Sequence, residues 1–320
     1  MKHFALRSVT VLGLCLLLLL QASAMPDRLI PGGNTVGMAL ELDGVSVVEF
    51  SNDLAKKAGL HCGDLIVAVD DKPISTVGEL QEAASAAQGR MLRLTVQRDG
   101  KERQLKLSPA DTPQGPRLGI LVRDRLMGIG TLTYYNADDG TFGALGHGVN
   151  SADTGELLPM KEGILLPTAV DSVEKGKAGA PGSLKGSLCS GESCGEIQKN
   201  TPQGIFGTMS PVDSEALPVA SSDMVKKGNA EILSNVRGTE VRRYAVQILE
   251  LYPSDSHERN LLLRVTDPEL LNLTGGIVQG MSGSPIIQDG HLIGAVTHVL
   301  VDDPTQGYGI FIENMLNAAA

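Results

Sequence analysis

The residues best suited to chemistry lie in a short glycine-rich segment near the C-terminal end, Gly280-Met-Ser-Gly-Ser-Pro285. A nucleophilic serine needs its hydroxyl exposed on a tight turn, with backbone N–H groups aimed at the negative charge that develops on the attacked oxygen. Gly280 and Gly283 permit strained backbone dihedrals, and an apolar hairpin that would hold the turn rigid follows them. The segment therefore predicts a reactive serine, with an ordinary barrel turn as the alternative.

A serine nucleophile needs a base, and the sequence has six histidines to choose from. His147 stands between two glycines at the end of an expected hairpin, where its imidazole is approachable. His298 lies within the strand-like run Val296-Thr-His-Val-Leu300, where alternation makes it a packing residue. We therefore expect His147 to be the general base, with a structural histidine at a strand end as the alternative.

The elements that must position these residues form a strand-rich block over residues 117–320. Gly128–Tyr135 and Thr141–Leu145 are expected to form one hairpin, which ends at His147. Pro285–Gln288 and His291–Leu300 flank Asp289-Gly290, a strong hairpin signal. Strands at this spacing predict an antiparallel barrel or a pair of barrels.

A smaller block over residues 30–108 alternates strand-like and helix-like patterns. Val45–Phe50 and Leu65–Val69 are expected strands, and Val77–Ala87 has the apolar spacing of a helix. Asp99-Gly100 marks a second hairpin. Residues 109–116 lie in a segment with three prolines, Ser108-Pro-Ala-Asp-Thr-Pro-Gln-Gly-Pro116, and are expected to be a linker between the blocks.

Composition narrows the classes of function. With 27 Lys+Arg against 37 Asp+Glu the formal net charge is −10, which disfavours nucleic acid as a partner. No metal site is expected, because there is neither a second Cys pair nor an HExxH segment, and no cofactor is predicted. Cys189 and Cys194 are close enough in sequence to form a small disulfide in an oxidising compartment, and their oxidation state stays open.

Residues 1–24 have the features of an export signal. Lys2 and Arg7 precede an apolar run over residues 9–20, and Ala22-Ser-Ala24 has the form of a signal-peptidase site. The run is short for a membrane span of about 20 residues. A cleaved signal and an uncleaved export anchor are both compatible with this pattern, and either one predicts that the body of the protein is exported.

Part of the first block resembles a bacterial PDZ domain. The resemblance rests on Ala55-Lys-Lys-Ala-Gly-Leu-His-Cys-Gly-Asp-Leu-Ile-Val-Ala-Val69 and on Val96-Gln-Arg-Asp-Gly-Lys-Glu102. PDZ domains take up a peptide as an added strand beside a helix. The resemblance places this groove between helix Val77–Ala87 and a strand formed by Gly37, Met38, Ala39 and Leu40, where Ala39 replaces the usual glycine. A PDZ domain that only docks on its neighbouring domain is the alternative.

The serine segment resembles the G-D-S-G-G-P pattern of chymotrypsin-like proteases. This resemblance places the nucleophile at Ser282 and implies an oxyanion hole formed by the amides of Gly280 and Ser282. Met281 replaces the usual aspartate and Ser284 the usual second glycine. A histidine that precedes the serine in the chain, as His147 does, also matches the chymotrypsin order.

Several segments together resemble the SpoIVB peptidase family, the PDZ-containing stage IV sporulation serine proteases. They are Gly143-Ala-Leu-Gly-His-Gly-Val149, Asp153-Thr-Gly155, Gly204-Ile-Phe-Gly207, Val265-Thr-Asp-Pro-Glu-Leu-Leu271 and residues 275–315. The resemblance implies a mainly β protein, with an α+β PDZ domain at residues 30–108 and a chymotrypsin-like antiparallel β-barrel peptidase domain at residues 117–320.

The same resemblance implies a serine endopeptidase secreted into the space between the forespore and mother-cell membranes. There it would cleave itself and a membrane-bound regulator of an intramembrane protease, which leads to activation of a late sigma factor. An envelope quality-control protease similar to the HtrA group is one alternative. A PDZ signalling module without catalytic activity is another.

The acid that would orient His147 is less well defined. The family pattern indicates Asp267, fifteen residues before Ser282. Chymotrypsin-like enzymes draw this aspartate from nearer the histidine, which favours Asp153 or Asp171 instead. Asp267 also precedes Pro268 and is suited to cap a short helix. All three aspartates, and a site without an acid, stay open.

Overall fold

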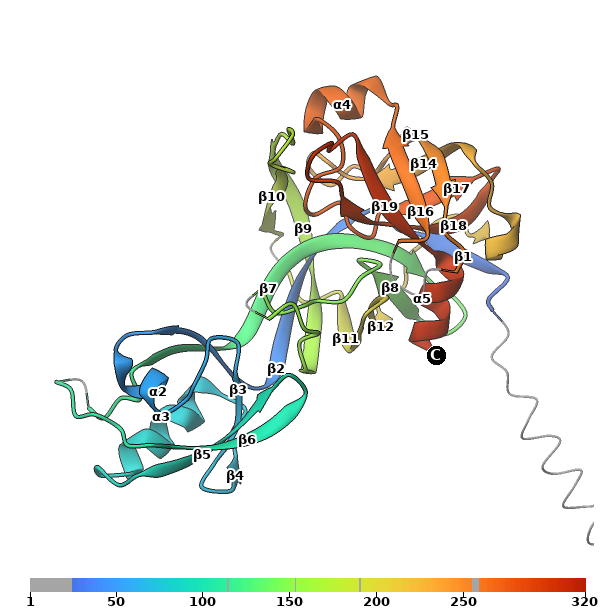
Figure 1. Cartoon of the computed structure of the whole chain (residues 1–320). Coiled ribbons are helices and arrows are strands. Elements are labelled where there is room, and N and C mark those ends of the chain that lie inside the picture. The colour runs from blue at the N-terminus through green and yellow to red at the C-terminus, as the bar shows by residue number, and fades with distance from the viewer. Residues whose placement is uncertain (1–24, 114, 153, 190, 255–258) are drawn as a thin grey trace, which may run out of the picture.

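The computed structural model describes residues 25–113, 115–152, 154–189, 191–254 and 259–320. The predicted export signal, residues 1–24, and the candidate acid Asp153 lie outside the described residues. Strands dominate the described part, and Figure 1 shows a PDZ unit to one side of two packed barrels. The mainly β fold with a PDZ domain and a chymotrypsin-like barrel domain is confirmed.

The first barrel closes through six strands. They follow the order β7 (Ile120–Tyr135), β8 (Thr141–Ala144), β12 (Gly204–Met209), β11 (Gly195–Thr201), β9 (Met160–Glu174) and β2 (Thr35–Phe50), and β2 pairs with β7 to close the ring. Its core contains Val36, Leu132, Phe142 and Leu165, all buried. Strands β1 (Arg28–Pro31), β10 (Ser183–Leu188) and β13 (Leu217–Pro218) extend the sheet.

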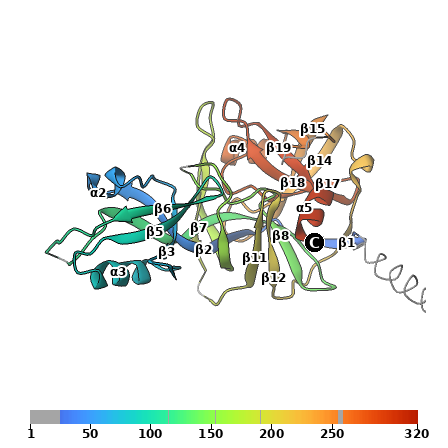
Figure 2. The same cartoon turned by 60° about the horizontal axis from the view of Figure 1, so that its bottom comes forward.

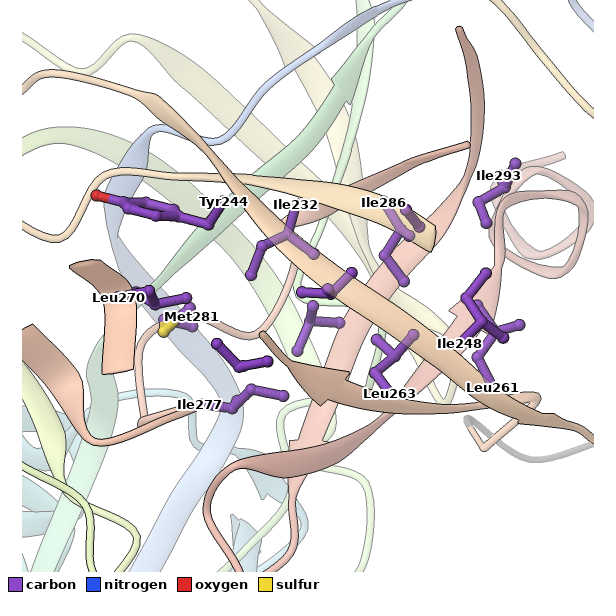
Figure 3. Close-up of a cluster of buried hydrophobic side chains, with 14 of the residues drawn as sticks. Ile232, Tyr244, Ile248, Leu261, Leu263, Leu270, Ile277, Met281, Ile286 and Ile293 are labelled. Atoms are coloured by element: carbon purple, nitrogen blue, oxygen red, sulfur yellow. The ribbon is translucent and has the colours of Figure 1, made fainter. Parts of the chain in front are cut away.

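The second barrel is also closed by six strands. Their order is β14 (Gly228–Ser234), β15 (Arg242–Leu251), β16 (Leu261–Val265), β19 (Gln306–Phe311), β18 (His291–Val299) and β17 (Pro285–Gln288). A short helical turn η1 (Ser222–Met224) precedes it, and helices α4 (Pro268–Thr274) and α5 (Ile312–Ala319) accompany it. Figure 3 shows its core, in which Met281 lies beside Leu270 among branched aliphatic side chains.

The PDZ unit packs strands and helices around a core of its own. It contains α2 (Asp53–Lys57), β3 (Leu65–Val69), β4 (Lys72–Pro73), α3 (Val77–Ala86), β5 (Leu92–Arg98) and β6 (Lys101–Leu107). The Thr76 side chain caps α3, and Glu79 completes the capping box. Asp64 is wholly buried, accepts a hydrogen bond from the His61 amide and forms a two-point ion pair with Arg98. Asp64 thereby fixes the turn into β3.

The two ends of the predicted linker, residues 109–116, lie together at the PDZ unit. Ala110 and Arg117 exchange backbone hydrogen bonds, and Leu118 is buried in the PDZ core. The chain crosses between the units inside β2 and β7 instead, both of which are 16 residues long. Figures 1 and 2 both show β7 running from the PDZ unit into the first barrel. The PDZ domain is therefore an insertion between barrel strands.

The prediction that Gly37, Met38, Ala39 and Leu40 form the edge of the peptide groove is wrong. These residues lie in the barrel half of β2, where both edges of the strand are already paired, with β7 on one side and β9 on the other. Met38 and Leu40 are buried in the core of the first barrel. An added peptide strand needs a free edge, so these residues cannot accept one.

Helix α3 lies against a different segment, the start of β7. The Val77 amide donates to Asp124 Oδ2 at 2.8 Å, and Gln81 Nε2 donates to the Pro116 carbonyl at 3.1 Å.

Within the described part of the chain, no helix is long and apolar enough to cross a membrane.

Candidate active site

The serine turn is a tight loop fastened to β18. Gly280 and Gly283 both have φ of 98°, in the region that favours glycine. The Ser284 amide donates to the Met281 carbonyl at 3.0 Å, which closes the turn. Gly283 N donates to the Val296 carbonyl at 2.7 Å, and Val296 N donates to the Ser284 carbonyl at 2.9 Å. The predicted strained turn is present, and an adjacent strand holds it in place.

The first barrel clamps the same turn from the other side. The hydroxyl groups of Thr131 and Thr133 donate to the carbonyls of Gly280 and Gly283, each at 2.8 Å. The Thr131 amide also donates to the Ser282 carbonyl at 2.9 Å. Both threonines are 0% exposed. Because three carbonyls of the turn are engaged towards β7, the turn cannot rotate without breaking buried hydrogen bonds.

The two amides predicted to form the oxyanion hole carry no competing bond. Among the described residues, neither Gly280 N nor Ser282 N donates to a protein acceptor, whereas the amides of Met281, Gly283 and Ser284 all do. Donors that are held in place and unpaired can stabilise an oxyanion without reorganisation.

Met281 stands where chymotrypsin-like proteases carry an aspartate, and its side chain explains how this turn is anchored. It is 0% exposed and packs in the core of the second barrel (Figure 3). Ser284, at the other altered position, is also 0% exposed, and its hydroxyl has no hydrogen-bond partner in the described part of the chain. Only Ser282 of the two serines is therefore accessible, being half-buried rather than enclosed.

The Ser282 hydroxyl donates to the Thr297 carbonyl at 2.7 Å. Thr297 lies at a β-bulge of β18, where the register against β19 shifts between Val296 and His298. The hydroxyl must leave this acceptor and turn towards a base before it can attack a substrate carbonyl.

His147 reaches the same place from the first barrel. The chain leaves β8 through Leu145 and Gly146, both with positive φ, and a Cβ at Gly146 would lie 2.9 Å from Thr297 Cγ2. This close approach seats the histidine loop against the bulge. The His147 ring centroid is 5.1 Å from that of His298. Ser282 and His147, 135 positions apart in the sequence, thus contact two adjacent residues of β18, Thr297 and His298 respectively.

The hydrogen bond of the His147 ring suits a general base. Nδ1 lies 2.8 Å from the Gly148 carbonyl, which can only accept. This bond places the proton of the neutral imidazole on Nδ1 and leaves Nε2 as an acceptor, the tautomer required to deprotonate a serine.

Asn200 holds the segment that follows His147, and sequence reasoning missed it. Its side-chain oxygen accepts from the Val149 amide at 2.9 Å, and its Nδ2 donates to the carbonyls of Val149 and Leu158 at 2.9 and 3.0 Å. An asparagine in a strand carries no signal in sequence that would indicate this bridge.

The aspartates proposed as the orienting acid occupy different places. Asp267 caps α4, with Oδ1 accepting from the amides of Glu269 and Leu270 at 2.9 and 3.0 Å, while Oδ2 accepts from Ala245 N at 3.3 Å. Asp171, on β9, accepts from the Ser187 hydroxyl at 3.0 Å. The predicted cap is confirmed, whereas the role of Asp267 as the triad acid stays a prediction.

His298 is a functional candidate, although strand alternation predicts that it is a packing residue. A bulge places an extra residue in one strand and re-aims the side chains beyond it, so His298 faces His147. The pKa of His298 is lowered to about 4, first by burial and then by the nearby His147 and Arg259. Its ring is therefore neutral at physiological pH.

The described cysteines Cys62, Cys189 and Cys194 are free thiols. Burial raises the pKa of the Cys194 thiol, which makes it less reactive. Across the described ranges, no group of three or more His, Cys, Asp or Glu side chains is arranged to hold a metal ion.

Comparison with protein families gives two matches that divide the chain near residue 110. A model described as SpoIVB peptidase S55 matches residues 114–316, well over half of the chain. A PDZ domain model matches residues 35–108. The PDZ model begins inside β2, part of which the structure assigns to the first barrel.

Curated proteins match over a short segment. The zinc metalloprotease RasP of Geobacillus kaustophilus is 34% identical over 68 residues, which is 21% of this chain and 16% of that protein. The putative zinc metalloprotease mll0638 of Mesorhizobium japonicum is 33% identical over 75 residues, 23% of this chain and 20% of that protein. This chain therefore spans only about a fifth of these relatives.

Among solved structures, the active form of the Rv3671c protease of M. tuberculosis has a TM-score of 0.36 and 14% identity. The match covers 60% of this chain and 72% of that one. The HtrA-type protease AlgW with a tripeptide has a TM-score of 0.37 and 13% identity, and the match covers 60% of this chain and 54% of that one.

Proposed function

The chain belongs to the SpoIVB peptidase family, and we propose that it is a serine endopeptidase with Ser282 as nucleophile and His147 as general base. The observation that carries this proposal is the serine turn. Its Gly280 and Ser282 amides are unpaired within the described chain, while its carbonyls are tied to Thr131 and Thr133. Such a turn is suited to receive an oxyanion and has no evident purpose in a barrel that only binds.

The mechanism is acyl transfer. Nε2 of His147 takes the hydroxyl proton as Ser282 Oγ leaves the Thr297 carbonyl and attacks the peptide carbonyl carbon. The Gly280 and Ser282 amides stabilise the negative oxygen of the tetrahedral intermediate. His147 then gives its proton to the departing amine as the C–N bond breaks. In deacylation His147 takes a proton from water, which attacks the acyl carbon, and returns that proton to Ser282 Oγ as the ester bond breaks.

The direct test is labelling and cleavage with a matched pair of serine variants. Ser282→Ala should abolish fluorophosphonate labelling and peptide cleavage while the protein stays folded. Ser284→Ala, two residues away, should keep both activities, since its hydroxyl is buried and makes no hydrogen bond to the described residues. Retained labelling in Ser282→Ala, together with its loss in Ser284→Ala, would move the nucleophile and overturn the proposal.

We further propose that the enzyme is exported through residues 1–24 and works between the two membranes that surround a forespore. Its substrates there would be a membrane-bound regulator of an intramembrane protease and a second copy of itself. Family membership supports this role, as does the signal-like sequence Ala22-Ser-Ala24.

Mass spectrometry of the purified protein and of Ser282→Ala would test the export signal and self-cleavage together. We expect an N-terminus at Met25 in both proteins, and internal cleavage products only where Ser282 is present. Products that persist in Ser282→Ala would show that another protease makes them. Broad degradation of unfolded proteins by the wild type would instead favour an HtrA-like quality-control role.

A further inference from the structure

We propose that His298 is a positioning residue for His147. The His298 ring supports the His147 imidazole and fixes the direction of the His147 Nε2. This inference rests on the proposed catalytic pair and adds a residue to it. The two rings are 5.1 Å apart between centroids and tilted by 37°. This is the separation of packed aromatic rings in an offset or tilted arrangement, so the His147 ring lies against the His298 ring.

The β-bulge in the backbone beside His298 also helps to position the catalytic residues. The bulge between Val296 and His298 presents the Thr297 carbonyl to the Ser282 hydroxyl and, one residue later, the His298 ring to His147. A single irregularity in β18 therefore sets the position of both reacting groups. Bulges recur next to active sites because they re-aim side chains in this way.

A purely structural role accounts poorly for a histidine at this position. Nδ1 of His298 is buried and has no hydrogen-bond partner in the described structure, and buried ring nitrogens in structural histidines are normally paired. A leucine or phenylalanine would fill the same space without leaving a polar atom unsatisfied. Such an unpaired group calls for a functional explanation.

The charge state of His298 suits a support for a catalytic base. Among the described residues, the titratable and charged groups around His298 are His147, whose ring packs against it, Tyr308, which pairs with it from β19, and Arg259, whose guanidinium lies 5.3 Å from the Tyr308 ring centroid. Burial, His147 and Arg259 all lower the pKa of His298. A neutral ring does not oppose the imidazolium that His147 becomes during the reaction, whereas a charged one would.

The test compares three substitutions in the full chain through the rate of fluorophosphonate labelling of Ser282 as a function of pH. This probe needs no knowledge of the natural substrate, and its acid limb reports the pKa of His147. His298→Ala should slow labelling by about tenfold to a hundredfold through loss of orientation. It should also move the acid limb to higher pH, because water replaces the ring beside His147.

The other two variants distinguish the effect of ring packing against His147 from the effect of charge beside it. His298→Phe keeps a ring of similar shape that cannot titrate and should restore most of the rate with the acid limb near its wild-type position. His298→Lys places a positive charge beside His147 and should move the acid limb to lower pH. Thermal unfolding of each variant checks that the protein remains folded.

A wild-type rate and acid limb in both His298→Ala and His298→Lys would overturn the inference while leaving the catalytic pair intact. Slow labelling in all three variants with an unmoved acid limb would also overturn it, since the residue would then be needed for folding of the site alone. Absence of labelling in the wild type would instead reject the proposed function itself.

Discussion

The geometry of the serine turn requires that position 283 carry no side chain. Gly283 has φ of 98°, and a Cβ there would lie 2.0 Å from the Thr131 carbonyl oxygen and 2.6 Å from the Leu145 amide nitrogen. Both obstacles are backbone atoms of the first barrel, so neither can rotate away. Gly283→Ala should therefore displace the turn from β7 and break the hydrogen bonds that Thr131 and Thr133 donate to it.

Gly290 provides a matched control, because it also has a positive φ, 77°, but a Cβ there would meet no atom within 4 Å. An L-residue in this backbone region costs about 1–2 kcal/mol, which is the whole expected effect of Gly290→Ala. Gly283→Ala adds overpacking, typically about 1–3 kcal/mol, for a total of about 2–5 kcal/mol. The two variants should therefore differ by about 1–3 kcal/mol, which at about 2–4 °C per kcal/mol for a domain of this size separates their melting temperatures by about 2–12 °C.

Thermal unfolding and fluorophosphonate labelling measure the two consequences. We expect Gly283→Ala to melt below Gly290→Ala and to lose labelling by about a hundredfold, since a displacement of about 1 Å is enough for such a loss. Gly290→Ala should label at the wild-type rate. Equal melting and equal labelling of the two variants would refute the claim that contact with the first barrel holds the turn.

Three further outcomes follow from the contacts described. Thr133→Val keeps the shape of a buried side chain but removes its hydrogen bond to the serine turn, so stability should fall by about 1–3 kcal/mol in urea unfolding and Ser282 labelling should slow. A chain that begins at Arg117 lacks β1 and β2 and should not fold. A chain in which Asn-Gly replaces residues 42–124 should fold, and circular dichroism would check both outcomes. The replacement is tolerated because Glu41 and Arg125 are paired and this dipeptide closes two-residue hairpins. The pKa of His298, about 4 against an ordinary 6.5, means that the unfolded chain binds the proton more readily, so stability should fall as the pH drops from about 6.5 to 4; His298→Phe should reduce this loss.

Features encoded by neighbouring residues were predicted correctly from the sequence. Asp99-Gly100 and Asp289-Gly290 each form the turn of a hairpin, and in both pairs the two residues have positive φ as such turns require. The cap at Asp267 and the strained glycines of the serine turn are likewise local. In these places the backbone conformation follows from residue type, so the sequence is sufficient.

The pairing of the long strands could not be predicted in this way. In β2 the pair Asp43-Gly44 lies where the register against β7 shifts between Glu41 and Ser46. Such a pair is typical of a turn, and it does not indicate that one continuous strand passes from the barrel into the PDZ unit. Which strands flank Gly37–Leu40 depends on β9, more than a hundred residues later. The peptide groove was misplaced for this reason, and the crossings between the units inside β2 and β7 were not predicted.

The same limit explains what was missed at the active site. Thr131, Thr133 and Asn200 act through contacts with segments far away in the chain, and a bulge changes the direction of His298 without any glycine or proline to signal it. Strand alternation holds only while the register is unbroken.

The PDZ unit is tied to the catalytic base by packing as well as by the chain. Leu65 of the PDZ unit lies in one hydrophobic cluster with Leu42 and Leu158, and Val149 packs against this cluster. Val149 and Leu158 begin and end the loop that follows His147, and Asn200 joins their backbones. A rotation of the PDZ unit would therefore disturb the histidine loop before it reached the serine turn, which is held separately by β7 and β18.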